Sequence, residues 1–242
     1  MSNASGRRAI LLAGGKGRRL RPYTSVLPKP LMPLGDRPIL EIVVTQLRDA
    51  GYLNLTMAVG HLASLIQAYF GDGEHLGVNI DYSMEDEPLG TAGPISLIDR
   101  PDDDFLVMNG DILTDLDYAA LFADHKESGD IATLVTYTKG VDLAFGVIDT
   151  EDDKRITSYT EKPSLSYLVS TGIYCFRPDV LDWLEPGVPR ALPDLMQSLV
   201  DAKETVRAYH HQGYWLDIGR PEDYEIAQEE MEAGRFSQKP TP

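Results

Sequence analysis

Short runs of apolar residues alternate along the chain with longer segments in which apolar residues recur every three or four positions. The run "AILLA", residues 9–13, has the length and composition of a buried strand and leads directly into glycines. Residues 39–47 repeat apolar side chains at helical spacing, with Pro38 suited to the first turn and Gly51 to the C-terminal cap. The same patterns predict strands at 54–60, 77–84, 104–111, 131–138 and 167–176, and helices at 61–71, 91–98, 118–129, 192–202 and 221–234.

This alternation of strands and helices predicts an α/β fold. Repeated strand–helix units place helices on both faces of a mostly parallel sheet, which gives a three-layer αβα sandwich with a mixed, Rossmann-like sheet. Residues 145–163 interrupt the alternation with a hairpin pattern around an acidic turn. No repeat, low-complexity tract or linker marks a boundary. We therefore expect a single domain over residues 1–242, with a core at about 8–235 and a short flexible tail.

Composition narrows the class of protein further. The 242 residues are 43% hydrophobic and 25% charged, as is usual for soluble globular proteins. No apolar run could span a bilayer, and the N-terminal residues lack the apolar region of a signal peptide, so we expect a cytoplasmic protein with no membrane partner. The single cysteine, Cys175, excludes an intramolecular disulfide. A net charge of −16 argues against a protein that coats nucleic acid.

One segment departs from this acidic background. Residues 11–35 combine several glycines and cations with no acidic residue. The glycine spacing fits neither a dinucleotide fingerprint, because Leu20 stands where the third glycine is needed, nor a P-loop. A tight loop with solvated basic residues is the plain alternative. The local concentration of cations instead favours a distinct phosphate-binding loop, in which glycine N–H groups approach phosphoryl oxygens and Arg18, Arg19 and Lys29 donate hydrogen bonds.

A family signature is present in this segment. "LLAGGKGRRLRPYTSVLPKPLMPLGDRPIL" resembles the pattern G-G-x-G-[ST]-R-L-x-P-x-T followed by P-K-P of the sugar-1-phosphate nucleotidyltransferase family. Five later segments match further motifs in the family's order: "EPLGTAGPI", "MNGD", "EKP", "STGIY" and "YWLDIGRPEDY". Together they cover the chain from Ile10 to about Gln228, and six motifs in sequence are highly specific. Arg18 departs from the pattern, since the family usually has Thr or Ser there. The resemblance implies the glycosyltransferase-A-like nucleotidyltransferase fold.

The resemblance also implies a reaction and a set of residues. A sugar 1-phosphate would attack the α-phosphorus of a nucleoside triphosphate, giving a nucleotide-sugar and pyrophosphate; two anions must meet, so the reaction needs positioning and charge neutralisation. The implied catalytic residues are Arg19, Lys29 and Asp111, and the implied Mg²⁺ ligands are Asp111 and Asp217. The implied nucleotide-binding residues are Leu12, Ala13, Gly14, Gly15, Gly17, Arg18, Glu85, Gly90 and Thr91. The implied sugar-phosphate-binding residues are Asn109, Gly146, Glu161, Lys162, Ser170 and Gly172.

The nucleotide base is predicted from Glu85, five positions before Gly90. Family members that use UTP or dTTP frequently carry glutamine at this spacing. A carboxylate offers acceptors only, which suits the adjacent N1–H and N2–H₂ donors of guanine, so GTP is favoured. A UTP- or other pyrimidine-dependent enzyme is the alternative, because a carboxylate can also reach N3–H of uracil.

Two further questions stay open at this point. A non-catalytic nucleotide-sugar sensor could share the fold. It is disfavoured, because a sensor would not need the metal pair Asp111 and Asp217 together with Arg19 and Lys29. The resemblance leaves open which sugar is used, although Ser170 stands where the family often has asparagine and so indicates a hydroxyl pattern unlike that of the common hexoses. Whether the chain forms a homo-oligomer is also open.

Overall fold

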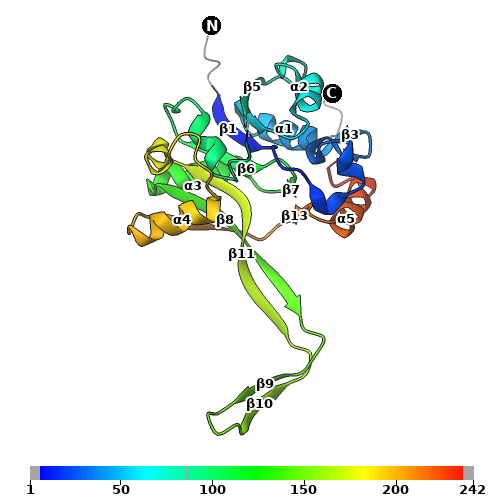
Figure 1. Cartoon of the computed structure of the whole chain (residues 1–242), viewed down its shortest axis with the longest axis vertical. Helices are drawn as coiled ribbons and strands as arrows, with labels where there is room; N and C mark the ends of the chain where they lie inside the picture. The colour runs from blue at the N-terminus through cyan, green and yellow to red at the C-terminus, as the bar shows by residue number, and fades with distance from the viewer. Residues whose placement is uncertain (1–5, 86, 237–242) are drawn as a thin grey trace.

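A seven-stranded sheet forms the centre of the computed structural model, which describes residues 6–85 and 87–236. Its strands are β1 (Arg7–Leu12), β4 (Tyr52–Val59), β5 (Asn79–Met84), β6 (Phe105–Asn109), β8 (Ala132–Asp142), β11 (Ser164–Phe176) and β12 (Val206–His211). They lie in the order β12-β8-β11-β6-β1-β4-β5 (Figure 1). Strand β11 is antiparallel to both of its neighbours, and the other pairs are parallel. The mixed, mostly parallel sheet predicted from the sequence is confirmed.

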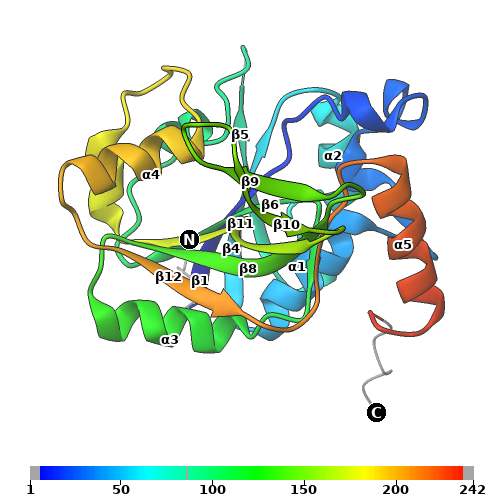
Figure 2. The same cartoon turned by 90° about the horizontal axis from the view of Figure 1, so that it is seen from below.

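Helices cover both faces of this sheet. They are α1 (Ile39–Asp49), α2 (Ala63–Phe70), α3 (Tyr118–Ser128), α4 (Leu192–Asp201) and α5 (Pro221–Glu232). Successive residues of β1 point to opposite faces: Leu11 joins the core that α1, α2 and α3 cover, whereas Ile10 joins the core that α4 covers. Figure 2 shows α3 and α4 on opposite sides of the sheet, as the predicted three layers require. Among the described helices, none has the length and apolar character needed to cross a membrane.

The ends of α3 illustrate how local sequence sets the elements. The Asp117 carboxylate accepts hydrogen bonds from the backbone N–H groups of Ala119 (3.0 Å) and Ala120 (2.9 Å). After the last turn, Gly129 adopts a left-handed conformation with φ 68° and donates its N–H to the carbonyl of His125. These two caps satisfy backbone groups that the helix itself leaves unpaired.

Two short ladders lie outside the main sheet. Strand β2 (Pro33–Leu34) pairs with β3 (Arg37–Pro38), and β7 (Ile112–Thr114) pairs antiparallel with β13 (Trp215–Asp217). The second ladder sets Asp217 opposite Ile112, one residue after Asp111. It thereby joins the end of β6 to the C-terminal part of the chain.

Two local predictions differ from the structure. Within the helix expected at 91–98, the chain forms a 3₁₀ helix, Gly93–Leu97; a Cβ at Gly93 would lie 2.7 Å from the Leu89 Cβ, so close packing shapes this turn. Phe236, which follows the core expected at about 8–235, is not part of a flexible tail, because it is buried and its ring lies 5.5 Å from that of Tyr214. Residues 237–242 of that tail lie outside the described residues.

A long two-stranded arm, residues 138–170, leaves the body (Figure 1). The β8–β11 ladder continues along it as far as the pair Ser164–Asp142. The hairpin expected at 145–163 forms its far end, as β9 (Val147–Thr150) and β10 (Ile156–Thr160). A register shift between Ser170 and Tyr174, with Gly172 at φ 78°, marks the point where the arm joins the sheet.

Candidate active site

A cavity of about 860 Å³ opens where β1, β4 and β6 end. The glycine-rich loop after β1 forms one wall, Gly60 and His61 after β4 form another, and Asn109 and Asp111 lie at the end of β6. Ligands of open α/β sheets bind in the crevice beyond the carboxyl ends of the strands. The cavity therefore has the position that this architecture provides for a ligand.

Close packing explains two glycines of the loop. A Cβ at Gly14 would lie 2.6 Å from Oε1 of Glu85, so this backbone approaches the opposite wall more closely than a side chain allows. Gly17 has φ 55°, and its carbonyl accepts a hydrogen bond of 2.8 Å from the hydroxyl of Thr24. A Cβ at Gly15, by contrast, would meet nothing within 4 Å, so the space beside this residue is open to a ligand.

Lys29 is the buried cation of the site. It begins the 3₁₀ turn Lys29–Leu31, and only 9% of the residue is exposed. Its ammonium group forms an ion pair with Asp111 and lies 3.9 Å from Oδ1 of Asp217. The β7–β13 ladder places the two aspartates together, and the N–H of Ile218 donates to the carbonyl of Asp111 at 3.2 Å. Arg19 lies beside this cluster. Its guanidinium group packs against Gly219, two residues after Asp217, where a Cβ would lie 3.2 Å from Nη2.

The aspartate pair fits a divalent cation. Oδ1 of Asp111 is buried and has no hydrogen-bond partner among the described residues. Burial, and then the charge of Asp111, raises the pKa of Asp217, while Lys29 and Arg19 lower it. No group of three or more His, Cys, Asp or Glu side chains in the described parts of the chain could hold a metal ion. A cation at this pair would take its remaining ligands from water and phosphate oxygens, which suits Mg²⁺.

Glu85 lies across the cavity from the loop and is half buried. Its Oε2 accepts a hydrogen bond of 2.9 Å from the N–H of Leu89, which leaves Oε1 on the side of Gly14. Burial raises the pKa of Glu85, and the Leu89 hydrogen bond opposes the shift. One carboxylate oxygen is therefore held by a backbone N–H, while the other lies against Gly14 in the wall of the cavity.

The segment after Glu85 is held against the N-terminus of α4. Gly90 has φ 77°, and a Cβ there would lie 2.6 Å from the carbonyl oxygen of Arg190. The hydroxyl of Thr91 accepts a hydrogen bond of 2.7 Å from the N–H of Leu192, the first residue of α4. Backbone contacts with the start of α4 thus hold this wall of the cavity in place.

A second cavity, of about 510 Å³, adjoins the first and shares Arg19 and Gly219 with it. Its lining includes Asp217 together with Lys139, whose Nζ lies 5.8 Å above the ring of Trp215. The Trp215 ring in turn lies 5.4 Å from that of Tyr137. The paired aspartates therefore stand between two cavities, each of which is lined by cations.

The nucleotidyl transferase family profile matches residues 8–234. The chain belongs to this family. It is 38% identical over 237 residues to a UTP–glucose-1-phosphate uridylyltransferase of Synechocystis, covering 90% of the chain and 61% of that protein. It is 34% identical over 226 residues to a mannose-1-phosphate guanyltransferase of Schizosaccharomyces pombe, covering 90% of the chain and 62% of that protein. The chain thus spans about three fifths of the length of these relatives.

Solved structures share the fold. A Bacillus anthracis protein crystallised with a sucrose superposes with a TM-score of 0.77 at 24% identity, over 98% of each chain. HddC from Yersinia pseudotuberculosis, complexed with GMP-PN, gives a TM-score of 0.69 at 23% identity, covering 93% of this chain and 99% of that one. The nucleotidyltransferase fold predicted from the resemblance is confirmed.

For this nucleotidyl transferase domain, the structure brings most of the predicted residues together. The larger cavity is lined by Leu12, Ala13, Gly14, Gly15, Gly17, Arg18, Arg19, Lys29, Glu85, Gly90, Thr91, Asn109 and Asp111. Asp217 lines the second cavity, within ion-pair distance of Lys29. The residues predicted for the phosphate loop and the base thus line one cavity, whereas the two predicted metal ligands lie at its junction with the second.

The residues predicted for the sugar phosphate are divided between the body and the arm. Gly172 lies beside Asn109, since a Cβ there would be 2.7 Å from the Asn109 Nδ2, and the Ser170 hydroxyl lies 3.2 Å from that of Tyr174. On the arm, a Cβ at Gly146 would lie 3.1 Å from Oε2 of Glu161. Lys162 follows with φ 44°. Neither cavity is lined by Gly146, Glu161 or Lys162.

Sequence reasoning missed several lining residues. His61 lines the larger cavity and directly follows the strand expected at 54–60. Because site residues tend to follow parallel strands, His61 could have been identified from the sequence. Tyr137, Lys139 and Trp215 carry no such signal, because β8 of the central sheet and β13 of the separate β7–β13 ladder are far apart in the sequence and meet only in the folded chain.

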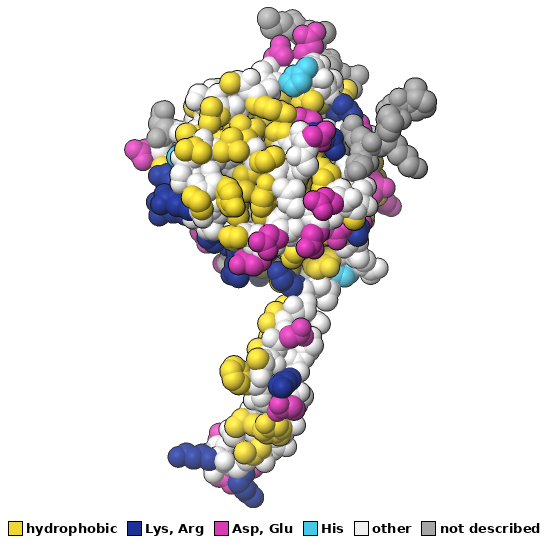
Figure 3. Space-filling view, turned by 90° about the vertical axis from the view of Figure 1, so that its right-hand side faces the viewer, with side chains coloured by type: hydrophobic (Ala, Val, Ile, Leu, Met, Phe, Trp, Pro, Cys, Tyr) yellow, Lys and Arg dark blue, Asp and Glu magenta, His cyan; other side chains and the backbone are white. Residues whose placement is uncertain are grey.

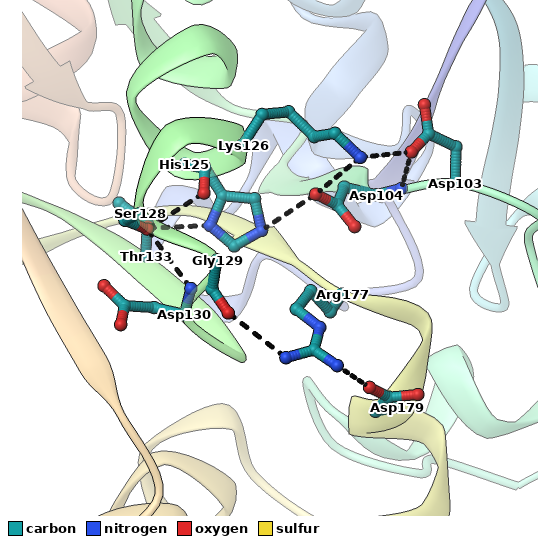
Figure 4. A network of polar contacts seen from close by, with 10 residues as sticks. All are labelled: Asp103, Asp104, His125, Lys126, Ser128, Gly129, Asp130, Thr133, Arg177 and Asp179. Atoms are coloured by element: carbon teal, nitrogen blue, oxygen red, sulfur yellow. Dashed lines mark hydrogen bonds and ion pairs between the residues drawn. The ribbon is translucent and has the colours of Figure 1, made fainter.

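A buried histidine lies outside the site. His125 of α3 is fully buried, its Nδ1 lies 2.8 Å from the Thr133 hydroxyl, and its Nε2 lies 3.7 Å from Oδ2 of Asp104 (Figure 4). Burial lowers the pKa of His125, with Asp104 opposing the shift. None of these residues lines either cavity, so the network joins α3 to the sheet.

Proposed function

We propose that the domain transfers a nucleoside monophosphate from a nucleoside triphosphate to a sugar 1-phosphate and releases pyrophosphate. One observation carries this proposal. The glycine loop and the buried pair of Lys29 and Asp111 converge on a single cavity, and Asp217 connects it to a second cavity lined by cations. Two adjoining cavities with cations between them suit two phosphorylated substrates that must meet.

The residues around the junction have distinct tasks in this reaction. A phosphate oxygen of the sugar 1-phosphate forms a bond to the α-phosphorus, and the bond from that phosphorus to the pyrophosphate oxygen breaks. Arg19 and Lys29 donate to phosphate oxygens and offset the negative charge that accumulates between the substrates. Asp111 and Asp217 would hold Mg²⁺, which would neutralise part of the negative charge of the phosphate groups.

Glu85 supports GTP as the nucleotide. Its Oε2 is held by the Leu89 N–H, whereas Oε1, beside Gly14, would accept hydrogen bonds from a base bound in the cavity. Guanine offers adjacent donors to such an acceptor. The similarity to a mannose-1-phosphate guanyltransferase of Schizosaccharomyces pombe supports this choice of nucleotide.

UTP is the second candidate, and a specific observation favours it. The carboxylate of Glu85, with Oε2 held by the Leu89 N–H and Oε1 beside Gly14, can also accept a hydrogen bond from N3–H of uracil. The similarity to a UTP–glucose-1-phosphate uridylyltransferase of Synechocystis supports UTP as this alternative.

A pyrophosphate-release assay tests both the proposed reaction and the proposed nucleotide. ATP, GTP, CTP, UTP and dTTP are each combined with a panel of sugar 1-phosphates in the presence of Mg²⁺, and mass spectrometry identifies the nucleotide-sugar. We expect release that requires both substrates, with GTP the best donor. Binding of nucleotide-sugar without any turnover would overturn the proposed reaction in favour of a sensor.

A further inference from the structure

The β7–β13 ladder, which carries the aspartates of the site, is short. It contains three residue pairs, from Trp215–Thr114 to Asp217–Ile112. Asp217 ends β13 and Asp111 directly precedes β7, so both carboxylates stand at one end of this ladder. A two-stranded ribbon of this size is only marginally stable by itself. The separation of the two carboxylates therefore depends on what holds the ladder at its other end.

Hydrogen bonds close that other end of the ladder. The Thr114 hydroxyl donates to the carbonyl of Tyr214 at 2.8 Å, and the Tyr214 N–H donates to Oδ1 of Asp115 at 2.7 Å. The Asp115 N–H in turn donates to the Tyr214 carbonyl at 3.3 Å. Gly213 permits this arrangement, because a Cβ at that position would overlap with Oδ1 of Asp115. The residue before β13 is thus bound to the last residue of β7 and to the residue that follows it.

His211 lies at the centre of these hydrogen bonds. Its Nε2 is 3.0 Å from the Tyr214 carbonyl oxygen and 3.1 Å from Oδ1 of Asp115. The same nitrogen lies 3.3 Å from the Thr114 hydroxyl. A carbonyl and a carboxylate only accept hydrogen bonds, so Nε2 must carry a hydrogen and donate it. Because only 10% of the His211 side chain is exposed, water competes little for these contacts.

The central sheet holds His211 in place from the other side. His211 is the last residue of β12, and it pairs with Tyr137 of β8. The arm begins at the next residue of β8 and projects from the body (Figure 3). Neither His211 nor Asp115 lines either cavity. Any effect of these residues on the site is therefore exerted through the ladder.

We propose that His211, together with Asp115, is a positioning residue that holds the end of the β7–β13 ladder and so fixes the separation of the two carboxylates of the site. A cation shared by two carboxylates gains from both only when their oxygens keep the separation that its coordination shell requires, and Mg²⁺ demands a near-ideal geometry. The consequence for turnover rests on the proposed function, whereas the effect on cation binding rests on the ladder.

Binding of Mn²⁺, followed by electron paramagnetic resonance, tests the proposal without any turnover. His211→Leu removes the donor, whereas His211→Gln keeps an N–H group close to the position of Nε2. Removing groups that support metal ligands typically weakens metal binding 10–100-fold. We expect the Kd for Mn²⁺ to rise about tenfold in His211→Leu, the lower end of this range, because Thr114 and Asp115 keep their own hydrogen bonds to Tyr214. His211→Gln should bind Mn²⁺ nearly as tightly as the wild type.

A matched control separates positioning from general stability. His125 is also buried and hydrogen-bonded, but it lies outside the site, so His125→Leu should lower the Tm and leave the Kd for Mn²⁺ unchanged. An equal loss of Mn²⁺ affinity in His125→Leu would overturn the proposal. So would wild-type affinity in His211→Leu, or a His211→Gln variant that binds as weakly as His211→Leu.

A double variant tests whether His211 and Asp115 act together. Asp115→Ala should also raise the Kd for Mn²⁺. The variant with both His211→Leu and Asp115→Ala should raise it by less than the product of the two single effects, because both residues hold the same end of the ladder. Single effects that multiply in the double variant would overturn the joint role.

Nucleotide binding and turnover distinguish this proposal from the proposed function. In EDTA, His211→Leu should bind GTP and UTP as the wild type does, since Glu85 and the phosphate loop are unchanged. With Mg²⁺ its kcat should fall, and a higher Mg²⁺ concentration should restore part of the loss. If the wild type binds Mn²⁺ and the variants respond as expected but no pyrophosphate is released, the proposed function fails and the positioning role stands. A wild type that binds no Mn²⁺ at millimolar concentration would overturn the positioning role.

Discussion

Glu85→Gln should change which nucleotide the protein uses. The side chain keeps its shape, and the glutamine carbonyl can accept the Leu89 N–H that Oε2 now accepts. The amide N–H₂ then replaces Oε1, the oxygen beside Gly14 that is proposed to contact the base. A guanine edge would meet a donor where it needs an acceptor, while a pyrimidine edge would meet both a donor and an acceptor.

The size of the effect follows from that single exchanged atom. One hydrogen-bond mismatch at a partly buried edge costs about 1–3 kcal/mol, so the ratio of kcat/KM for GTP to that for UTP should fall roughly ten- to a hundredfold. Because Glu85 is only half buried, we expect little change in the temperature of unfolding. Glu87→Gln is the matched control, since Glu87 lines the same cavity but is exposed.

The measurement is a set of initial rates with each nucleotide, repeated across pH. Burial raises the pKa of Glu85, so the preference for GTP in the wild type should decline as the pH falls toward that pKa. The Gln variant should show no such decline. Equal use of GTP and UTP by the wild type, or an unchanged ratio in the variant, would refute the role of Glu85 in reading the base.

Three further predictions concern the aspartates, the loop and the buried histidine. Asp111→Asn or Asp217→Asn should nearly abolish turnover and leave the circular dichroism spectrum unchanged; near-native rates at saturating Mg²⁺ would remove that residue from the metal site. Loss of the Arg19 side chain should lower kcat by about 10²–10³, and Arg18→Thr much less, with the reverse order refuting the assigned roles. Burial lowers the pKa of His125, so on acidification the unfolded chain takes up a proton before the folded one does, and stability falls as the pH drops below about 6.5. His125→Gln should flatten this part of the plot of Tm against pH, and an unchanged slope would contradict the assignment.

Much of the central sheet and the larger cavity could be predicted from the sequence. Buried strands such as residues 9–13 appear as short apolar runs. Asn109 and Asp111 were named from the family resemblance, and they lie where residues that follow parallel strands meet at one edge of the sheet. The extended arm could not be predicted, because a hairpin pattern at 145–163 fixes neither how far the flanking strands run nor what they pack against. The second cavity was missed for a related reason: Lys139 and Trp215 meet only through long-range strand topology.

The β7–β13 ladder has a consequence for how this molecule could diversify. It fixes the spacing of Asp111 and Asp217 by backbone hydrogen bonds between segments that enclose all of residues 115–214. The loops of that interval, and the arm outside the central sheet, can change in length without moving either carboxylate, provided that the sheet and the two short strands still pair. In the proposed reaction, a different acceptor could thus be accommodated by changes in these loops, while the relative position of the two carboxylates stays the same.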